Sequence, residues 1–189
     1  TNNIPIIHND KVCERLGEKE NSFVLGIFQK YNMYLDKNRP HIVLVNPSNM
    51  GNIGTIIRTV LGFGYKDLAI ITPAADIWNP KTIRASMGSF FKMNIECFCS
   101  FDDYKTKYSE HRLFPFMLHG HLKLTYDNCP KSSLFSLIFG NEATGLDDSF
   151  LSVGEAIKIP QTNDVDSLNL AVASAIGAYT FAVKNGLIE

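Results

Sequence analysis

The feature that most constrains the fold is a series of short apolar runs separated by helical or polar segments. The first five runs are bounded by turn residues, as are the buried strands of a parallel sheet. Between the first two runs, apolar residues from Ile53 to Leu61 recur at the spacing of an amphipathic helix. This alternation predicts an α/β domain with a parallel sheet flanked by helices. The predicted strands are residues 42–45, 68–71, 95–98, 113–118, 135–139 and 156–159.

The C-terminal segment carries the clearest helical pattern. We expect Ser167 to be its N-cap and the Asn185-Gly186 pair to end it. Many of its positions are Ala, Ser or Gly, so another backbone can approach closely, either in the core or at a subunit interface. Its apolar stripe consists of Leu168, Ala171, Val172, Ala175, Ile176 and Tyr179.

Residues 1–40 differ in character from the rest of the chain. Segment 14–21 is polar, 23–28 fits a strand, and 36–40 is typical of a linker. The chain begins without Met and without a basic-then-apolar signal pattern, so we expect a fragment of a longer chain rather than a secreted precursor. We predict an N-terminal extension, or the remnant of an upstream substrate-recognition domain, at 1–40 and the α/β domain at 41–189.

Composition and charge limit the classes of function. The chain is 45% apolar, has no apolar run long enough to cross a membrane, and carries four cysteines that we expect to be reduced thiols of a cytoplasmic protein. The C-x-C at 97–99 and the H-x-H at 119–121 are weak metal-site patterns, so we expect no metal. A net charge of −1 gives no bulk attraction to nucleic acid. Cations gather locally in the first half, at Arg39, Arg58, Lys81, Arg84 and Lys92.

The first candidate motif follows the first predicted strand. Gly51 and Gly54 are spaced G-x-x-G with no Lys after them, which matches neither a dinucleotide fingerprint nor a P-loop. Arg58 follows Gly54 by one helical turn and would lean back over it toward Asn52, at the edge where α/β sheets bind ligands. Alternatively, Arg58 is a solvated side chain and Asn52 is the helix N-cap. Asn49 competes with Asn52 for the motif position, and the spacing to Arg58 favours Asn52.

Two further motifs follow later strands. In 139-FGNEATGL-146, the glycines permit close approach of a ligand, and Glu142 can accept hydrogen bonds or hold a cation. The alternative is an ordinary loop between a strand and a helix. In 159-IPQTNDVDSLN-169, Ser167 fits a plain helix cap, whereas Asn169 has less structural reason to stand inside a helix.

Together, these segments resemble the SpoU, or TrmH-like, branch of the SPOUT RNA methyltransferases, over about residues 41–183. The three motifs occur in the order and spacing of that family, and 85-ASMGSFF-91 is similar to its S-x-G stretch. The matching residues are Asn52, Gly54 and Arg58 for N-x-G-x-x-x-R; Gly140, Glu142, Gly145 and Leu146 for G-x-E-x-x-G-L; and Ile159, Pro160, Ser167, Leu168 and Asn169 for I-P and S-L-N.

The resemblance implies a fold, a cofactor and a reaction. The family fold is a parallel α/β sheet whose C-terminal part forms a deep trefoil knot, a rare exception to the rule against knots. Family members are homodimers, paired through the knot region and the C-terminal helix, that bind S-adenosylmethionine and methylate RNA, usually at a ribose 2′-hydroxyl. We therefore expect tRNA or rRNA as partner. By position, the cofactor contacts would be Leu118, His119, Gly120, Phe139, Gly140, Asn141, Glu142, Ile159, Pro160, Gln161 and Leu168.

The chemistry of ribose methylation fits the candidate catalytic residues. A 2′-hydroxyl is a weak nucleophile, so its proton must be removed or its oxyanion stabilised. We expect Arg58 to do this, either as a base in a water-excluded site or by electrostatic orientation, because arginine is otherwise a poor base. Asn52, Glu142, Ser167 and Asn169 would position Arg58 and the ribose.

Two rival functions come from other classes. One is a catalytically silent SPOUT dimer that only binds RNA, and the presence of all five candidate catalytic residues argues against it. The other is an ordinary nucleotide-binding α/β enzyme, which the missing fingerprints disfavour. Asp164 and Asp166 fall near the expected position of anionic RNA, where they would tune or weaken its binding.

Overall fold

A computed structural model describes residues 5–17 and 24–189. The chain divides into two compact units, Thr1–Tyr31 and Asn32–Glu189, each considered by itself. The first unit contains the short helix α1 (Asp10–Leu16), whose N-cap side chain is Asn9. Residues 24–28 form no strand, so the strand prediction is wrong over those positions. Phe23, the first residue of that prediction, lies outside the described residues.

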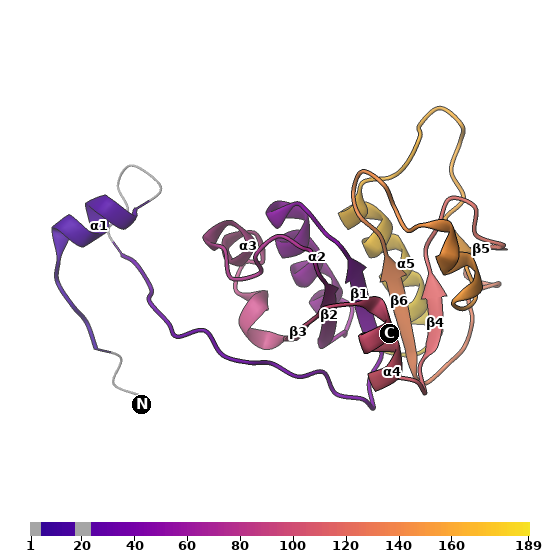
Figure 1. Ribbon diagram of the computed structural model, residues 1–189, viewed down its shortest axis with the longest axis horizontal. Coiled ribbons are helices and arrows are strands. Elements are labelled where there is room, and N and C mark those ends of the chain that lie inside the picture. Colours follow the sequence, from indigo (N-terminus) through magenta and orange to yellow (C-terminus); the bar gives the residue numbers. More distant parts are fainter. Residues whose placement is uncertain (1–4, 18–23) are drawn as a thin grey trace. The chain divides into compact units, whose positions relative to one another are not determined.

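The second unit is built on a five-stranded parallel sheet (Figure 1). The strand order is β3-β2-β1-β6-β4, which places β1 in the middle. Every residue of β1, β2 and β6 is buried, which explains why these strands are apolar runs rather than alternating patterns. The parallel α/β architecture is thereby confirmed. The strands are β1 (His41–Val45), β2 (Asp67–Ile71), β3 (Asn94–Phe98), β4 (Arg112–Pro115) and β6 (Phe135–Phe139).

Two of the predicted strands differ from expectation. The run 113–118 leaves the sheet after Pro115, and the N–H of Met117 donates to the carbonyl of Ile157 at 2.8 Å. The run 156–159 stays outside the main sheet and pairs in parallel with a segment that follows β4. This pairing draws the loop after β4 against the chain that leads to the last helix. The two short strands are β5 (Leu122–Lys123) and β7 (Ile157–Lys158).

Apolar side chains cover both faces of the sheet. Ile42 and Leu44 of β1 belong to one buried cluster, together with residues of α2 and α5. Val43 and Val45 point to the opposite face and pack with residues of α4 and η2. The helices are α2 (Met50–Gly62), α3 (Pro80–Ala85), α4 (Phe101–Lys107) and α5 (Leu170–Lys184), with the 3₁₀ turns η1 (Ser89–Lys92) and η2 (Asp148–Ser152) (Figure 1).

Helix α2 has the predicted amphipathic stripe. Four residues of the stripe are fully buried: Ile53, Ile56, Ile57 and Val60. Leu61 is partly buried against the hydrophobic cluster that also contains Ile42 and Leu44 of β1. The sequence pattern between the first two strands is therefore confirmed as a helix that packs on the sheet.

Helix α5 begins later than predicted and buries a different face. Its N-cap is Asn169, whose side chain accepts a hydrogen bond from the N–H of Ala171 at 2.8 Å, so the prediction of Ser167 as N-cap is wrong. Three residues of the predicted stripe are exposed: Val172 (47%), Ile176 (37%) and Tyr179 (53%). The buried face is offset around the helix and consists of Leu170, Ala171, Ser174, Gly177, Ala178, Phe181 and Ala182. The predicted end is confirmed, with Asn185 as C-cap and Gly186 at φ 71°.

Hydrogen bonds hold the segment just before β1 against the strands. The N–H of Leu35 donates to Glu96, and the N–H of Asp36 donates to the buried carboxylate of Asp67 at 2.8 Å. The buried His41 ring bonds the carbonyl of Asp36. Residues 32–40 thus belong to the second unit, and the assignment of 1–40 to an N-terminal extension or the remnant of an upstream domain stays a prediction. Over the described residues, no helix is both long and apolar enough to cross a membrane.

Candidate active site

The candidate site lies at the carboxyl ends of β1 and β6, which are neighbours in the sheet. After β6 the chain folds back on itself, with reciprocal backbone hydrogen bonds between Asn141 and Gly145 at 3.2 and 2.9 Å. The Asn141 amide donates to the carbonyl of Asn46, just after β1, at 2.7 Å. A Cβ at Gly140 would lie 2.2 Å from the carbonyl carbon of Gly145, and Gly145 itself has φ 70°. Both positions of the second motif therefore require glycine.

Glu142 joins this loop to the turn that opens α2. One carboxylate oxygen accepts hydrogen bonds from the N–H and the hydroxyl of Ser48, at 2.9 and 2.8 Å. The other accepts from the N–H of Asn49 and the amide of Asn52, at 3.0 and 3.2 Å. Burial alone would raise the pKa of Glu142, but the hydrogen bonds from Ser48 and Asn52 outweigh it and lower the pKa to about 2. Glu142 is therefore ionised at neutral pH, and both of its carboxylate oxygens accept hydrogen bonds from this turn.

The asparagines of the first and third motifs meet beside Glu142. Asn49 is the N-cap of α2, because its side chain accepts from the N–H groups of Gly51 and Asn52 at 2.9 and 3.1 Å. The alternative that Asn52 is the N-cap is therefore wrong. The Asn52 amide donates to Glu142, and its oxygen accepts a long hydrogen bond of 3.4 Å from the amide of Asn169. Glu142, Asn52 and Asn169 thus connect all three motifs.

Arg58 and Gly54 do not have the relation predicted for them. A Cβ on the buried Gly54 would lie 2.5 Å from both the carbonyl oxygen of Thr82 and the Cβ of Ala85. Gly54 allows α3 to approach α2 and does not clear space for Arg58, so that prediction is wrong. Arg58 is exposed on α2, and within the described part of the chain its side chain has no hydrogen-bond or ion-pair partner. Arg58 is therefore free to meet a ligand that approaches from solvent.

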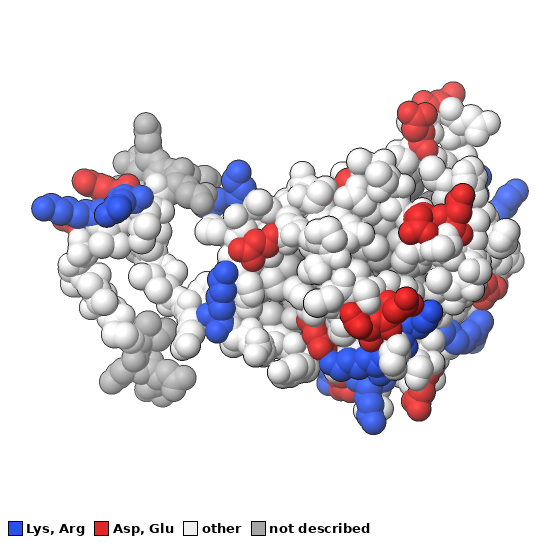
Figure 2. Space-filling view, viewed as in Figure 1, with Lys and Arg blue, Asp and Glu red and all other residues white. Residues whose placement is uncertain are grey.

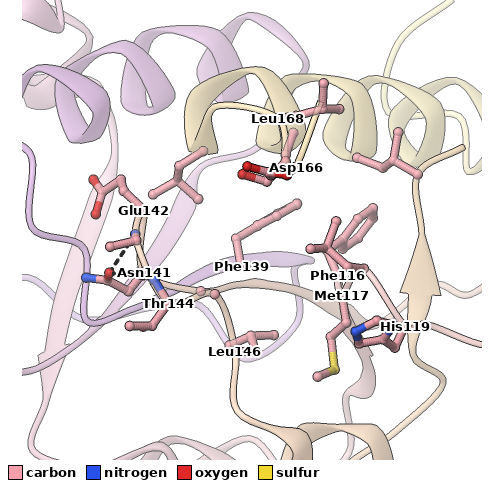
Figure 3. Close-up of a pocket in the computed structure, with 18 of the residues that line it drawn as sticks. Phe116, Met117, His119, Phe139, Asn141, Glu142, Thr144, Leu146, Asp166 and Leu168 are labelled. Carbon is pink, nitrogen blue, oxygen red and sulfur yellow. Dashed lines mark hydrogen bonds between the residues drawn. The ribbon is translucent and has the colours of Figure 1, made fainter. Parts of the chain in front are cut away.

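A cavity of about 450 Å³ opens beside these residues (Figure 3). All of the predicted cofactor residues except Gly120 and Pro160 line it. Gly120 instead permits close backbone passage, because a Cβ there would lie 2.4 Å from the carbonyl carbon of Ile157. Of the predicted catalytic residues, Glu142 and Ser167 line the cavity, whereas Asn52, Arg58 and Asn169 stand outside its lining.

Several lining residues were missed by sequence reasoning. Phe116 stacks on Phe139 with ring centroids 4.5 Å apart, and the two rings form an apolar wall. Phe116 was assigned to a strand, and nothing in its pattern indicated that it leaves the sheet. Asp148 and Asp166 also line the cavity, although Asp166 was expected to lie near RNA. Among the described residues, no group of three His, Cys, Asp or Glu side chains could hold a metal ion.

A parallel sheet with a cavity at its carboxyl edge, joined to three such motifs, is the arrangement of an RNA methyltransferase domain. The chain belongs to the SpoU rRNA methylase family, whose model matches residues 39–179.

Three similar proteins illustrate the relationship. A 23S rRNA guanosine 2′-O-methyltransferase of Bacillus subtilis is 33% identical over 132 residues, which are 68% of this chain and 52% of that protein. The AdoMet-bound rRNA methyltransferase of Sinorhizobium meliloti superimposes with a TM-score of 0.79 and 27% identity, over 91% of this chain and 69% of that one. A structure described as concerning 2-OH methylation of C/U34 on tRNA superimposes with a TM-score of 0.71 and 28% identity, over 79% of this chain and 97% of that one. The chain spans about half the length of the Bacillus relative.

The substitution Glu142→Gln tests the connection between the second and first motifs. It keeps the shape but removes the charge that accepts the donors of Ser48, Asn49 and Asn52, so we expect a loss of about 1 kcal/mol in the free energy of unfolding at pH 7, after allowance for solvent screening. Because the folded pKa lies below the ordinary value of 4.5, this stability is present above pH 4.5 and is lost as the pH falls toward 2.

Urea denaturation of both proteins at pH 7 and pH 3 measures this effect. The difference between wild type and Glu142→Gln is expected to shrink at pH 3. Glu155→Gln, at an exposed ion pair with Arg112, is the matched control and is expected to change stability by less than about 0.5 kcal/mol. An equal loss in the two variants at pH 7 would show that the Glu142 carboxylate does not hold the turn.

Proposed function

We propose that this chain transfers a methyl group from S-adenosylmethionine to a ribose 2′-hydroxyl of tRNA or rRNA in the cytoplasm. The observation that carries the proposal is the connection of the cavity to the Glu142, Asn52 and Asn169 cluster, and through α2 to the exposed Arg58. The names of the relatives support both RNA classes, since one acts on 23S rRNA and another structure concerns tRNA.

The cavity fits S-adenosylmethionine in size and chemistry. Its volume of about 450 Å³ falls within the usual range for small-molecule sites. Phe116, stacked on the buried Phe139, provides apolar surface for the adenine, and the backbone of the loop after β6 lines the cavity beside it. When bound, this cofactor supplies a methyl group on a positively charged sulfur, and transfer to the ribose oxygen leaves a neutral thioether and releases the hydroxyl proton.

The residues outside the cavity act on the ribose. Asn52 is held by Glu142 on one side and by Asn169 on the other, so its position is fixed before RNA arrives. Arg58, exposed on the same helix, stabilises the ribose oxygen as it loses its proton, and bound RNA covers it from water. Ser167, exposed at the cavity rim, completes the contacts to the ribose. We propose that residues 1–40 are an N-terminal extension or the remnant of an upstream substrate-recognition domain.

The substitution Arg58→Ala separates chemistry from cofactor binding. We expect methyl transfer from labelled S-adenosylmethionine to total tRNA and rRNA to fall by at least about a hundredfold, the usual loss when a group that stabilises an oxyanion is removed. The Kd for S-adenosylmethionine, measured by calorimetry, is expected to stay within about twofold because Arg58 does not line the cavity.

Lys66→Ala is the control for Arg58→Ala, because Lys66 is also an exposed cation but stands beside the amino end of β2. Its activity is expected to equal that of wild type. Undiminished transfer in Arg58→Ala would contradict the role of Arg58, and methylation mapped to a base rather than a ribose would contradict the proposed reaction.

We also propose that the C-terminal part of the chain forms a deep trefoil knot. The support is the close parallel pairing of β7 with the loop after β4, in which the N–H of Met117 donates to the carbonyl of Ile157 and the N–H of Leu124 to that of Lys158, both at 2.8 Å. Mechanical stretching of single molecules by their two ends tests the threading. When extended, a knotted chain stays shorter than the length of about 3.3 to 3.6 Å per residue that an unknotted chain reaches. An extended chain of the full unknotted length would contradict the knot.

The protein is further proposed to be a homodimer that pairs through the knot region and α5. The outer face of α5 exposes Val172, Ile176 and Tyr179, a run of apolar surface that a second copy would cover. Analytical ultracentrifugation is expected to give twice the chain mass of 21.1 kDa. Val172→Asp is expected to give monomers, whereas the control Thr106→Asp on α4 leaves the dimer intact. A monomeric wild type would contradict the pairing.

A further inference from the structure

The charged residues that line the cavity are acidic. Among the described residues of the lining, Glu142, Asp148 and Asp166 carry carboxylates, and none is Lys or Arg. The stretch 159–169, which closes one side of the cavity, also has no Lys or Arg. Figure 2 shows acidic side chains over the loop between β7 and α5. The cavity therefore presents negative charge to whatever it binds.

The three carboxylates differ in how far hydrogen bonds or nearby N–H groups offset their negative charge. Glu142 accepts hydrogen bonds from Ser48, Asn49 and Asn52, and its carboxylate points away from the cavity (Figure 3). Asp148 lies in the first turn of η2, where the N–H groups of that turn partly offset its charge.

Asp166 is the carboxylate that is available to a ligand. It points into the cavity beside Phe139 and Leu168 (Figure 3). Within the described part of the chain its carboxylate has no hydrogen-bond or ion-pair partner, so its charge is not offset. The Gln161 amide donates long hydrogen bonds to the carbonyls of Val165 and Asp166, at 3.4 and 3.5 Å, and bridges the two ends of this turn.

We infer that Asp166 is a specificity residue that makes the cavity prefer S-adenosylmethionine over its demethylated product, S-adenosylhomocysteine; this inference rests on the proposed function. The two molecules share adenine, ribose and amino acid, and they differ by one methyl group and one positive charge on sulfur. On this inference, the Asp166 carboxylate lies near the sulfur and attracts the sulfonium charge, which only S-adenosylmethionine carries. The product loses this attraction when the methyl group leaves, so Asp166 also promotes exchange of product for fresh cofactor.

Calorimetric titration of the full chain with each of the two molecules tests the inference. A pair of unit charges about 4 Å apart in water-like surroundings changes an equilibrium constant about fivefold. We therefore expect Asp166→Asn to weaken S-adenosylmethionine about fivefold while leaving S-adenosylhomocysteine within about twofold. Asp164→Asn is the matched control, since Asp164 is an exposed acid of the same loop outside the cavity lining, and it is expected to change neither.

Ionic strength provides a second readout. Added salt is expected to weaken S-adenosylmethionine binding more in wild type than in Asp166→Asn, because screening acts on the charge pair that the variant lacks. A parallel loss for both molecules would overturn the inference and assign Asp166 to a group that they share, such as a ribose hydroxyl. An unchanged ratio of the two Kd values would overturn it as well. A wild type that binds neither molecule would instead overturn the proposed function, and the inference with it.

Discussion

The site depends on the hydrogen bonds that Glu142 accepts. Its carboxylate belongs to the loop after β6, and its donors belong to the turn after β1, about 90 residues earlier in the chain. Two neighbouring parallel strands bring these loops to the same edge, but register alone does not fix the loops against each other. The two backbone N–H groups of Ser48 and Asn49 would otherwise need water. Glu142 satisfies both and leaves Asn52 aimed at the third motif.

Glycine has three separate functions around this cluster. Gly140 and Gly145 let the loop after β6 fold tightly enough for Glu142 to reach the turn. Gly54 lets α3 press against α2, which fixes the helix that carries both Asn52 and Arg58. Gly120 lets the loop after β4 pass close to the backbone of β7, because a Cβ there would lie 2.4 Å from the carbonyl carbon of Ile157. Each is a place where a Cβ would collide with backbone, so the shape of the site follows from close backbone contacts.

Much of the fold was predictable because burial on both faces makes parallel strands uniformly apolar, as in β1, β2 and β6. The same apolar pattern predicted too long a strand at 113–118, because the apolar residues beyond Pro115 line the cavity instead of continuing the strand. The start of α5 was misplaced because Ser and Asn cap helices equally well, and in the structure it is Asn169 that makes the capping hydrogen bond. Motif spacing predicted that Glu142, Asn52 and Asn169 lie together. It could not show that Gly54 serves a helix contact, because its partner lies on another helix.

A chain of net charge −1 can serve an anionic substrate and a cationic cofactor if the two charged regions are far enough apart. Arg58 follows Asn52 by six residues, which on an α-helix is about 9 Å along the axis. In the proposed function, Arg58 faces the RNA and the acids face the cofactor, and the two groups meet only where the methyl group is transferred. Within that proposal, α2 keeps Arg58 outside the cavity lining, so the acidic cavity and the cation that faces RNA are separate parts of one site.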